Sequence, residues 1–432
     1  MKSYYIESLG CAKNLVDSET FAYILERRGY QSWESAEGAD IVMLNTCAFL
    51  QSALAELDDV LCQLAELKNQ GLIGRLFVSG CVMNRALEDF QPLFPEVDAW
   101  IPLKDFARLE ELINVREHNT LGRVRLEHGS HAYLRISDGC SNRCSYCTIP
   151  SIRGSLCSVP MEKLIDEAKA LAEDKASPCT ELIVIAQDTC SYGMDIYGKK
   201  MLPELLTELL KIDGIKWIRV MYMHPDHFET HWLKLWQEYP KLLPYFEIPV
   251  QHSEDRILKA MNRNRRGNEL RELFAVIKKE LPEAALRTTL ISGFPGESKG
   301  EALALHKFVR ETGFHHLGAF CYSPEPGTHA FDLPDQIVFT TAERRRMRLL
   351  TMHRAESQKL LESYIGSTVE VLIEDSDPDD KNLFVGRAWF QAMDIDGRTF
   401  VNGRKLRSGS IVKVEINDVI DLDLFGNVLP SK

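Results

Sequence analysis

Three cysteines lie within eight residues of one another in this chain, and they limit its fold and chemistry more than any other feature. Cys140, Cys144 and Cys147 are spaced C-x3-C-x2-C, directly after the apolar run Ala132–Ile136 and the turn Ser137–Gly139. Thiolates this close can occupy three corners of one cubane iron–sulfur cluster, whereas electron-transfer clusters usually take four cysteines. The triplet therefore predicts a cluster with one open iron, where a substrate or cofactor binds.

A zinc site is the alternative for the same three cysteines. Structural zinc sites take four Cys or His ligands, and their cysteines usually come as two close pairs. The sequence has no second close pair of cysteines. The tight triplet therefore favours the cluster of a radical S-adenosylmethionine (SAM) enzyme over zinc.

The N-terminal part of the chain alternates short apolar strands with amphipathic helices. Strands are predicted at Ser3–Glu7, Ile41–Leu44 and Leu76–Val78, and helices at Leu15–Arg28 and Gln51–Lys68. This alternation is typical of an α/β domain with a parallel sheet.

A cysteine follows each of these three strands: Cys11, Cys47 and Cys81. Because the loops at the carboxyl ends of parallel strands lie along one edge of a sheet, we expect the three thiols to meet there. Separate buried thiols are the alternative, since free cysteine is often buried. The repeated placement favours a second three-cysteine cluster.

A second α/β pattern follows, in which helical stretches separate six candidate strands. These strands are expected at Ala132–Ser137, Glu181–Ala186, Trp217–Met223, Tyr245–Pro249, Leu286–Ile291 and His316–Tyr322. Six such units predict an open, partial TIM-like barrel of (β/α)6 type. In barrels the chemistry takes place at the carboxyl ends of the strands.

Five residues next to these strands are candidates for cofactor contacts. Gln187 and Asp188 follow the second strand, Gln251 follows the fourth, and Gly293 follows the fifth, where it lets the backbone approach a nucleoside closely. Arg287, at the start of the fifth strand, could pair with the carboxylate of an amino-acid cofactor. The alternatives are a cap for Gln187 and Asp188, a simple tight turn for Gly293 and a surface ion pair for Arg287.

The C-terminal part of the chain has a different sequence pattern, dominated by short strands. A helical stretch at Thr341–Tyr364 precedes short strands at Thr368–Ile373, Leu383–Trp389, Thr399–Val401 and Ile411–Ile416, which predict a small antiparallel β-barrel, a common recognition module. From Gly366 to Lys432 there are 12 acidic and 8 basic residues, a net charge of -4. A barrel that grips RNA phosphates should be basic, so we expect this one to prefer a basic protein surface.

The length, charge and cysteine content limit the number of domains, the type of partner and the cellular location that we expect. The 432 residues suffice for two or three domains, and the net charge of -12 suits a basic partner rather than a large nucleic-acid footprint. No apolar run approaches the roughly 20 residues that span a bilayer, and the N-terminus lacks a signal-peptide pattern, so we expect a cytoplasmic protein. Eleven cysteines then indicate metal or thiol chemistry rather than disulfides. Five of them match no ligand spacing and are interpreted as packing or structural thiols: Cys62, Cys157, Cys179, Cys190 and Cys321.

Over its whole length the chain resembles the methylthiotransferases, a family of radical SAM enzymes. The resemblance rests on Ser8–Glu19, Gly139–Gly154 and Ile248–Leu258. The tRNA-modifying branch of that family tends to have Gln-Met after its first cysteine, where this chain has Ala12-Lys13. The closer resemblance is to the branch that modifies ribosomal protein S12, although Ala12 stands where that branch usually has proline.

The resemblance implies three domains and two clusters. We expect a methylthiotransferase cluster domain at 1–115, a radical SAM domain at 126–356 and a TRAM domain at 357–432, with Asn114–Gly122 as the linker after the first. The family carries two [4Fe-4S] clusters. They match the Cys140, Cys144 and Cys147 set for the radical cluster and the Cys11, Cys47 and Cys81 set for the other.

The resemblance also implies the reaction. In the family, SAM chelates the open iron and is cleaved to a radical that abstracts hydrogen, here from the β-carbon of an aspartate in S12. The second cluster presents sulfur, and another SAM supplies the methyl group. Expected partners are S12, free or on the ribosome, and an electron donor, with tRNA not expected. Two alternatives stay open at this point: methylthiolation of a tRNA adenosine, and a non-catalytic iron–sulfur ribosome-binding factor.

Overall fold

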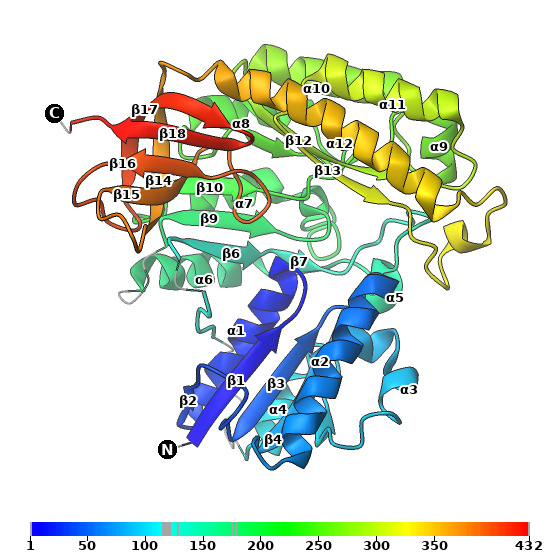
Figure 1. The fold of residues 1–432 in the computed structure, drawn as a ribbon, viewed down its shortest axis with the longest axis vertical. Coiled ribbons are helices and arrows are strands. Elements are labelled where there is room, and N and C mark those ends of the chain that lie inside the picture. The colour runs from blue at the N-terminus through cyan, green and yellow to red at the C-terminus, as the bar shows by residue number, and fades with distance from the viewer. Residues whose placement is uncertain (1, 115–121, 128, 175–176, 178, 431–432) are drawn as a thin grey trace. The chain divides into compact units, whose positions relative to one another are not determined.

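The computed structural model describes residues 2–114, 122–127, 129–174, 177 and 179–430 (Figure 1). Residues 115–121, the middle of the expected linker, lie outside the described part. The chain forms two units. The first comprises Met1–His128, Ser137–Cys157 and Glu325–Thr328, and the second comprises Gly129–Ile136, Ser158–Pro324 and His329–Lys432.

A five-stranded, fully parallel sheet is the centre of the first unit. Its order is β2-β1-β3-β4-β5. The strands are β1 (Lys2–Ser8), β2 (Tyr30–Ser32), β3 (Ile41–Thr46), β4 (Arg75–Gly80) and β5 (Ala99–Trp100), and the helices are α1 (Ala12–Arg27), α2 (Gln51–Asn69), α3 (Leu87–Phe90) and α4 (Phe106–Leu112). The expected parallel α/β domain is confirmed, with the short strands β2 and β5 added at its edges.

Helices cover both faces of this sheet, as Figure 1 shows for α1 and α2. Ile41 and Met43 pack with side chains of α1 and α4, whereas Val42 and Leu44 pack with side chains of α2. Strand β3 is buried along its whole length because its alternate side chains enter the two different cores.

The segment Ser137–Cys157 also belongs to the first unit. It begins with the two-residue strand β7 (Ser137–Asp138), contains the helix α5 (Ile149–Arg153) and ends at the first residue of the strand β8 (Cys157–Ser158). The loop with the cysteine triplet is therefore in the same unit as the N-terminal sheet.

The second unit contains the six strands expected for the partial barrel. They form two parallel three-stranded sheets, β10-β9-β6 and β11-β12-β13, with Ile218 and Leu242 making a bridge between β10 and the segment before β11. The strands are β6 (His131–Arg135), β9 (Glu181–Ile185), β10 (Trp217–Val220), β11 (Tyr245–Glu247), β12 (Ala285–Ser292) and β13 (His316–Cys321). A single apolar core includes residues of all six strands, so the expected partial barrel is confirmed.

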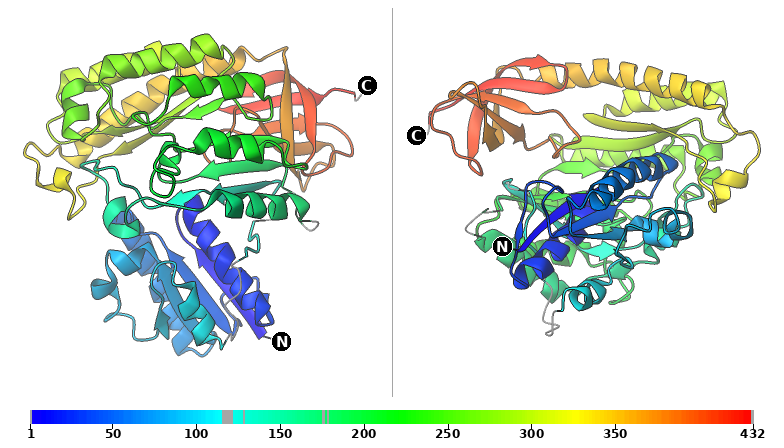
Figure 2. Two further views of the ribbon diagram at one scale, coloured as in Figure 1. Left: turned by 180° about the vertical axis from the view of Figure 1, so that it is seen from behind. Right: turned by 60° about the horizontal axis from the view of Figure 1, so that its bottom comes forward.

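Helices surround these two sheets. They are α6 (Met161–Glu173), α7 (Leu202–Leu209), α8 (Leu233–Glu238), α9 (Asp255–Ala260), α10 (Gly267–Glu280), α11 (Lys299–Thr312) and α12 (Phe339–Glu362). The longest, α12, runs along β12 and β13 towards the C-terminal barrel (Figure 2). Among the described residues, no helix is long and apolar enough to span a membrane.

The C-terminal strands close into a five-stranded barrel, in the order β14-β15-β16-β18-β17. They are β14 (Thr368–Ser376), β15 (Leu383–Ala388), β16 (Thr399–Asn402), β17 (Ile411–Ile420) and β18 (Asp423–Val428). The sequence interpretation missed β18, and the pairing of β16 with β18 is parallel rather than antiparallel. The barrel itself was expected and is confirmed.

Buried charges join this barrel to the amino ends of the strands in the second unit. Asp396 is fully buried and accepts hydrogen bonds from the Tyr245 hydroxyl at 2.7 Å and from the Arg287 guanidinium at 2.6 Å. Glu181, also fully buried, binds Arg219 at 2.6 Å and Arg387 of β15. These charged groups lie at the amino ends of the strands. The carboxyl ends, where the active sites of such barrels lie, are formed by other residues.

Candidate iron–sulfur centre

Cys11, Cys47 and Cys81 lie at the same edge of the N-terminal sheet. Cys11 precedes α1, Cys47 follows β3 directly, and Cys81 follows β4 directly. Strands β1, β3 and β4 are neighbours, paired in parallel up to Ser8–Asn45 and Thr46–Gly80. The expected convergence of the three loops is therefore present in the fold.

Two glycines let these loops approach one another closely. Gly10 has a φ of +97°, and a Cβ built on it would lie 2.6 Å from the Cβ of Cys47. Gly80 has a φ of +101°, and its Cβ would lie 2.4 Å from the Thr46 amide nitrogen. Both positions need glycine, since L-residues rarely adopt this backbone and no space is left for a side chain.

Buried amides fix the same loops. Asn14 Nδ2 donates to the carbonyls of Leu9 and Thr46, both at 2.8 Å, and Asn45 Nδ2 donates to the Asn14 carbonyl at 2.7 Å. The Thr46 hydroxyl donates to the Ser79 carbonyl at 2.8 Å and so ties in the loop of Cys81. Asn14, Asn45 and Thr46 were not predicted from the sequence. Their place as polar residues next to cysteines at the ends of buried strands could have indicated that they fix the site.

The thiols are close enough to influence one another. Burial raises the pKa of Cys81 to about 11, and Cys47 and Cys11 act in the same direction. Burial also raises the pKa of Cys47, again with a contribution from Cys11. Buried thiols that disfavour one another's charge suit a bound cation, because metal ligation deprotonates cysteine. The residues present therefore fit an iron–sulfur cluster.

The central triplet occupies one loop, and all three of its cysteines are partly buried. The Cys140 amide donates to the Gly154 carbonyl at 3.0 Å, and the Cys147 amide donates to the Cys144 carbonyl at 3.1 Å. Gly139 has a φ of +67°, and a Cβ there would lie 2.2 Å from the Ser155 carbonyl oxygen. The two arms of the loop are thus closed against each other in front of the cysteines.

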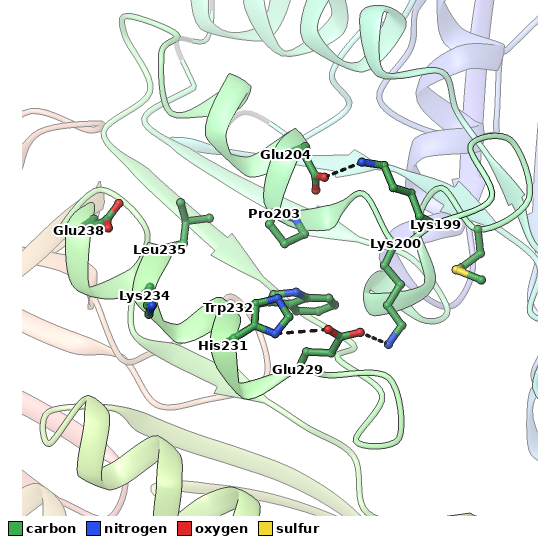
Figure 3. A pocket seen from close by; sticks show the side chains of 11 residues that line it. Lys199, Lys200, Pro203, Glu204, Glu229, His231, Trp232, Lys234, Leu235 and Glu238 are labelled. Atoms are coloured by element: carbon green, nitrogen blue, oxygen red, sulfur yellow. Dashed lines mark hydrogen bonds and ion pairs between the residues drawn. The ribbon is translucent and has the colours of Figure 1, made fainter.

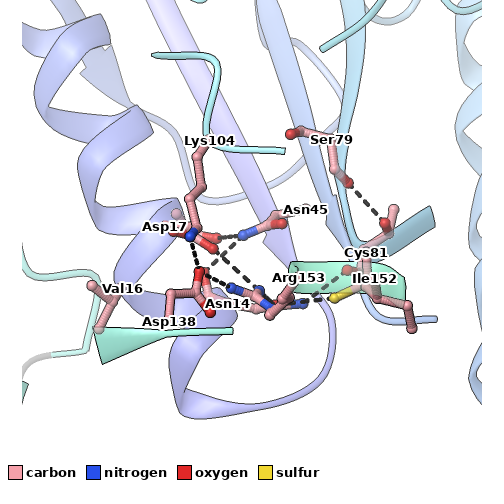
Figure 4. Close-up of polar contacts among 12 residues, drawn as sticks. Asn14, Val16, Asp17, Asn45, Ser79, Cys81, Lys104, Asp138, Ile152 and Arg153 are labelled. Atoms are coloured by element: carbon pink, nitrogen blue, oxygen red, sulfur yellow. Dashed lines mark hydrogen bonds and ion pairs between the residues drawn. The ribbon is translucent and has the colours of Figure 1, made fainter. Parts of the chain in front are cut away.

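This loop is bonded to the N-terminal sheet domain within the first unit. The Thr148 hydroxyl donates to the Phe49 carbonyl at 3.1 Å, and Asn84 Nδ2 donates to the Ile152 carbonyl at 2.7 Å. Arg153 makes further ion pairs with Asp138 and Asp17 (Figure 4). The two cysteine sets are therefore held by one connected framework.

In the second unit, polar residues gather at the carboxyl ends of β9 and β10. Asp188 is 2% exposed, and it accepts hydrogen bonds from the Cys190 amide at 3.1 Å and the Ser191 hydroxyl at 2.7 Å. His227 Nδ1 also contacts Asp188, and ligand atoms of Asp188, His224 and His227 lie within 4.8 Å of one another. Sequence reasoning selected Asp188 but not His227, which the fold brings to it.

The electrostatics of this group keep Asp188 ionised. Burial would raise the pKa of Asp188, but the hydrogen bond from His227 and the neighbouring His224 lower it to about 2. Burial and the Arg263 guanidinium lower the pKa of His224 to about 3, so this ring is neutral near pH 7. The arrangement presents a carboxylate and two imidazoles beside Gln187.

Gln251 follows β11 with an unusual backbone. Its φ is +69°, its amide donates to the Thr289 carbonyl at 2.9 Å, and its carbonyl accepts from Ile291 at 2.8 Å. A non-glycine residue in this region costs about 1–3 kcal/mol, and such residues are enriched at functional sites. Its neighbour His252 is fully buried against Glu297 and has a structural role.

Gly293 and Arg287 have contacts that explain them without a cofactor. A Cβ on Gly293, whose φ is +76°, would lie 2.3 Å from the Cβ of Ala342, so this glycine allows α12 to pack. Arg287 pairs with Asp396 at the amino end of β12, so its carboxylate partner is a residue of the C-terminal part of this chain. The surface-pair alternative for Arg287 does not apply either, because its partner is buried.

A surface pocket of about 610 Å³ lies elsewhere on the second unit (Figure 3). Two of its three lysines form ion pairs, since Lys199 pairs with Glu204 at 3.2 Å and Lys200 pairs with Glu229 at 2.7 Å. None of the candidate residues lines it. This pocket is therefore not the candidate site.

Comparison with known proteins gives three matches along the chain. Residues 3–102 match the Uncharacterized protein family UPF0004, residues 134–309 match the Radical SAM superfamily, and residues 365–429 match the TRAM domain. The three matched segments follow one another in the order expected from the sequence.

Relatives match almost the whole chain. A protein of Clostridioides difficile (strain 630), named ribosomal protein uS12 methylthiotransferase RimO, is 40% identical over 98% of both chains. Proteins of the same name from Aquifex aeolicus and Thermotoga maritima are 39% and 38% identical, each over 98% of this chain and over 96% and 99% of their own lengths.

Solved structures share the fold at low sequence identity. The radical SAM methyltransferase TsrM from Kitasatospora setae has a TM-score of 0.53 at 12% identity, covering 76% of this chain and 77% of its own. The cobalamin-dependent radical SAM enzyme OxsB has a TM-score of 0.51 at 13% identity, covering 83% of this chain and 56% of its own. These likenesses support the radical SAM fold alone.

Proposed function

The chain belongs to the family of the ribosomal protein uS12 methylthiotransferases, and from this premise we propose that it adds a methylthio group to the β-carbon of an aspartate of uS12. It is a radical SAM enzyme, with an iron–sulfur cluster and SAM as cofactors. The names of the relatives favour the ribosomal-protein branch over a tRNA-modifying enzyme and over a non-catalytic factor.

One observation carries the proposal: two sets of three cysteines share a single unit. Cys140, Cys144 and Cys147 would hold the cluster that binds SAM. Their loop is closed by the hydrogen bond from the Cys140 amide to the Gly154 carbonyl and by the close approach of Gly139 to Ser155. The bound cofactors supply the one-electron chemistry that activates an unreactive C–H bond. The protein's share is to fix the two cysteine sets relative to each other.

The second [4Fe-4S] cluster is part of the proposal. Cys11, Cys47 and Cys81 offer three thiols at one sheet edge, in the same number as the central loop, so a fourth iron again lacks a cysteine from its set. An open iron at this site would present the sulfur for transfer.

Cofactor contacts are proposed for Gln187, Asp188, Gln251 and Gly293. Asp188 stays ionised and is anchored by Ser191 and His227, so it is a fixed hydrogen-bond acceptor. The strained backbone of Gln251 supports a functional role for that residue. At Gly293 the packing of α12 already requires glycine, which makes it the weakest member of the set.

The proposed partners follow from the substrate. The net charge of -4 on the C-terminal barrel suits a basic ribosomal protein, met free or on the ribosome. Reductive chemistry also requires an electron donor. We place the reaction in the cytoplasm, where ribosomal proteins are made and assembled.

The test is anaerobic reconstitution followed by assay on a uS12 peptide with dithionite and SAM. About eight irons per chain would match two four-iron clusters, and a methylthio mass gain on aspartate is the expected product. The Cys144→Ala variant is the matched control and should give no product. Two clusters with an unmodified peptide, but a modified tRNA, would overturn the substrate assignment in favour of tRNA.

A further inference from the structure

Arg153 is a buried arginine that contacts the surroundings of both cysteine sets. Its side chain is 1% exposed, and its guanidinium binds Asp138 at 2.9 Å and Asp17 at 3.2 Å. The same group donates to the Asn14 side-chain oxygen (Figure 4). Asp138 lies two residues before Cys140, whereas Asn14 and Asp17 lie in the first turns of α1, directly after Cys11.

Asn14 connects Arg153 to the loops of the N-terminal thiols. Its side-chain oxygen accepts from the Arg153 guanidinium and from Cys81 Sγ, the latter at 3.8 Å. Asn14 Nδ2 donates at 2.8 Å to the carbonyl of Thr46, which directly precedes Cys47. Arg153 is therefore bonded to a residue that follows Cys11 and contacts the loops of Cys47 and Cys81.

Two carboxylates lie against the Arg153 guanidinium. Asp138 has a second partner, the ammonium group of Lys104, whose side chain is 31% exposed. Arg153 thus pairs with both carboxylates, and Lys104 pairs with that of Asp138. Three thiolates at the sheet edge would add negative charge close to the buried Arg153 guanidinium.

We propose that Arg153 is a positioning residue that compensates the charge of the N-terminal cluster and ties this cluster to the loop of the central one. The inference rests on the proposed second cluster. Its carboxylate bonds fix α1, and therefore Cys11, against the segment before Cys140. A fork of several N–H donors can hold both partners at once, which a lysine ammonium on a flexible stem does less well.

A cation beside a cluster favours the reduced state, because reduction adds negative charge, and hydrogen bonds and net charge set cluster potentials. Removing Arg153 should therefore shift the reduction potential of the N-terminal cluster to a more negative value. It should also release iron faster, because Cys11 and its helix lose their fixed position.

The experiment isolates the N-terminal cluster in the full-length chain by replacing Cys140, Cys144 and Cys147 with alanine. After anaerobic reconstitution, the potential is measured by redox titration with electron paramagnetic resonance, and iron loss is measured against a chelator. Arg153→Met is compared with Arg153→Lys and with Arg108→Met. Arg108 is a matched control, because it lies in the same unit but is 49% exposed and pairs only locally with Glu111.

The expected result is a negative shift and faster iron loss for Arg153→Met, a smaller change for Arg153→Lys, and the parent values for Arg108→Met. A potential and iron-loss rate equal to the parent's in both Arg153 variants would overturn the proposal. If Arg153→Met fails to fold, the iron-loss rate of Arg153→Lys decides, because lysine keeps the charge but loses the fork of donors that holds both carboxylates. A rate equal to the parent's would then overturn the proposal. If the parent binds no iron with Arg153 in place, the second cluster itself is refuted, and the proposed role of Arg153 is refuted with it.

Discussion

The guanidinium of Arg287 donates to the carboxylate of Asp396 at 2.6 Å, and this buried ion pair joins β12 to the C-terminal barrel. The Tyr245 hydroxyl and the Ala392 amide donate to the same carboxylate. Asp396 is therefore the shared acceptor of two strands of the partial barrel. These contacts make the C-terminal barrel a structural part of the second unit.

Replacing Asp396 with alanine should destabilise the second unit strongly. Removing one partner of a buried ion pair costs about 3–5 kcal/mol, because the other charge stays buried without its counterion. Asp421→Ala is the matched control: its pair with Arg354 is 59% exposed on both sides and should contribute less than about 1 kcal/mol. Urea unfolding of the two variants measures the difference, and equal losses would contradict this account.

Glu181 should make the stability of the protein depend on acid pH. Burial would raise its pKa, but Arg219 and Arg387 lower it from 4.5 to about 2. Since the folded pKa is depressed, the stabilisation is complete above about pH 4.5 and is lost as the pH falls towards 2. Glu181→Gln should therefore lower the free energy of unfolding at pH 7 and flatten its pH dependence between pH 4.5 and 2. Glu208→Gln, at a side chain that is 39% exposed, should leave the slope unchanged.

Local sequence patterns were sufficient to predict the N-terminal sheet, because each of its central strands is a short apolar run that ends close to a cysteine. They were insufficient for β18, where Gly426 and Asn427 interrupt the apolar alternation. A Cβ on Gly426 would lie 2.4 Å from the Glu415 carbonyl oxygen, so the glycine is needed where two strands pass closely. That requirement comes from the closed barrel and is invisible in the sequence of β18.

Long-range partners set the limit for the candidate site. Arg287 was expected to pair with the carboxylate of an amino-acid cofactor, but the sequence could not show that it pairs with Asp396, 109 residues away. Likewise Arg153 and Asp17 are 136 residues apart, and no periodicity connects them. Spacing within one loop predicts ligands well, whereas a pairing between distant segments depends on the topology that brings them together.

The two cysteine sets should separate two activities. Cys144→Ala should abolish SAM cleavage, since the central loop would keep only two thiols. Cys11→Ala should spare cleavage but stop the transfer of sulfur, and Cys62→Ala, on the exposed side of α2, should change neither. Chromatography of the cleaved nucleoside and mass spectrometry of the uS12 peptide measure the two steps. Unchanged methylthiolation after Cys11→Ala would refute the role of the N-terminal set.

Gly10 and Gly29 offer a direct test of the close approach between the loops of Cys11 and Cys47. Both have a positive φ, +97° and +80°, but a Cβ on Gly10 would collide with Cys47 whereas one on Gly29 would meet nothing within 4 Å. Gly29→Ala should therefore cost only the backbone strain, about 1–2 kcal/mol, and keep the full iron content. Gly10→Ala should in addition push Cys47 away and lower the iron bound by the N-terminal set. Iron and sulfide analysis of the two variants, in a chain without the central cysteines, distinguishes these outcomes. Equal iron content would mean that the approach of Gly10 to Cys47 does not matter for the cluster.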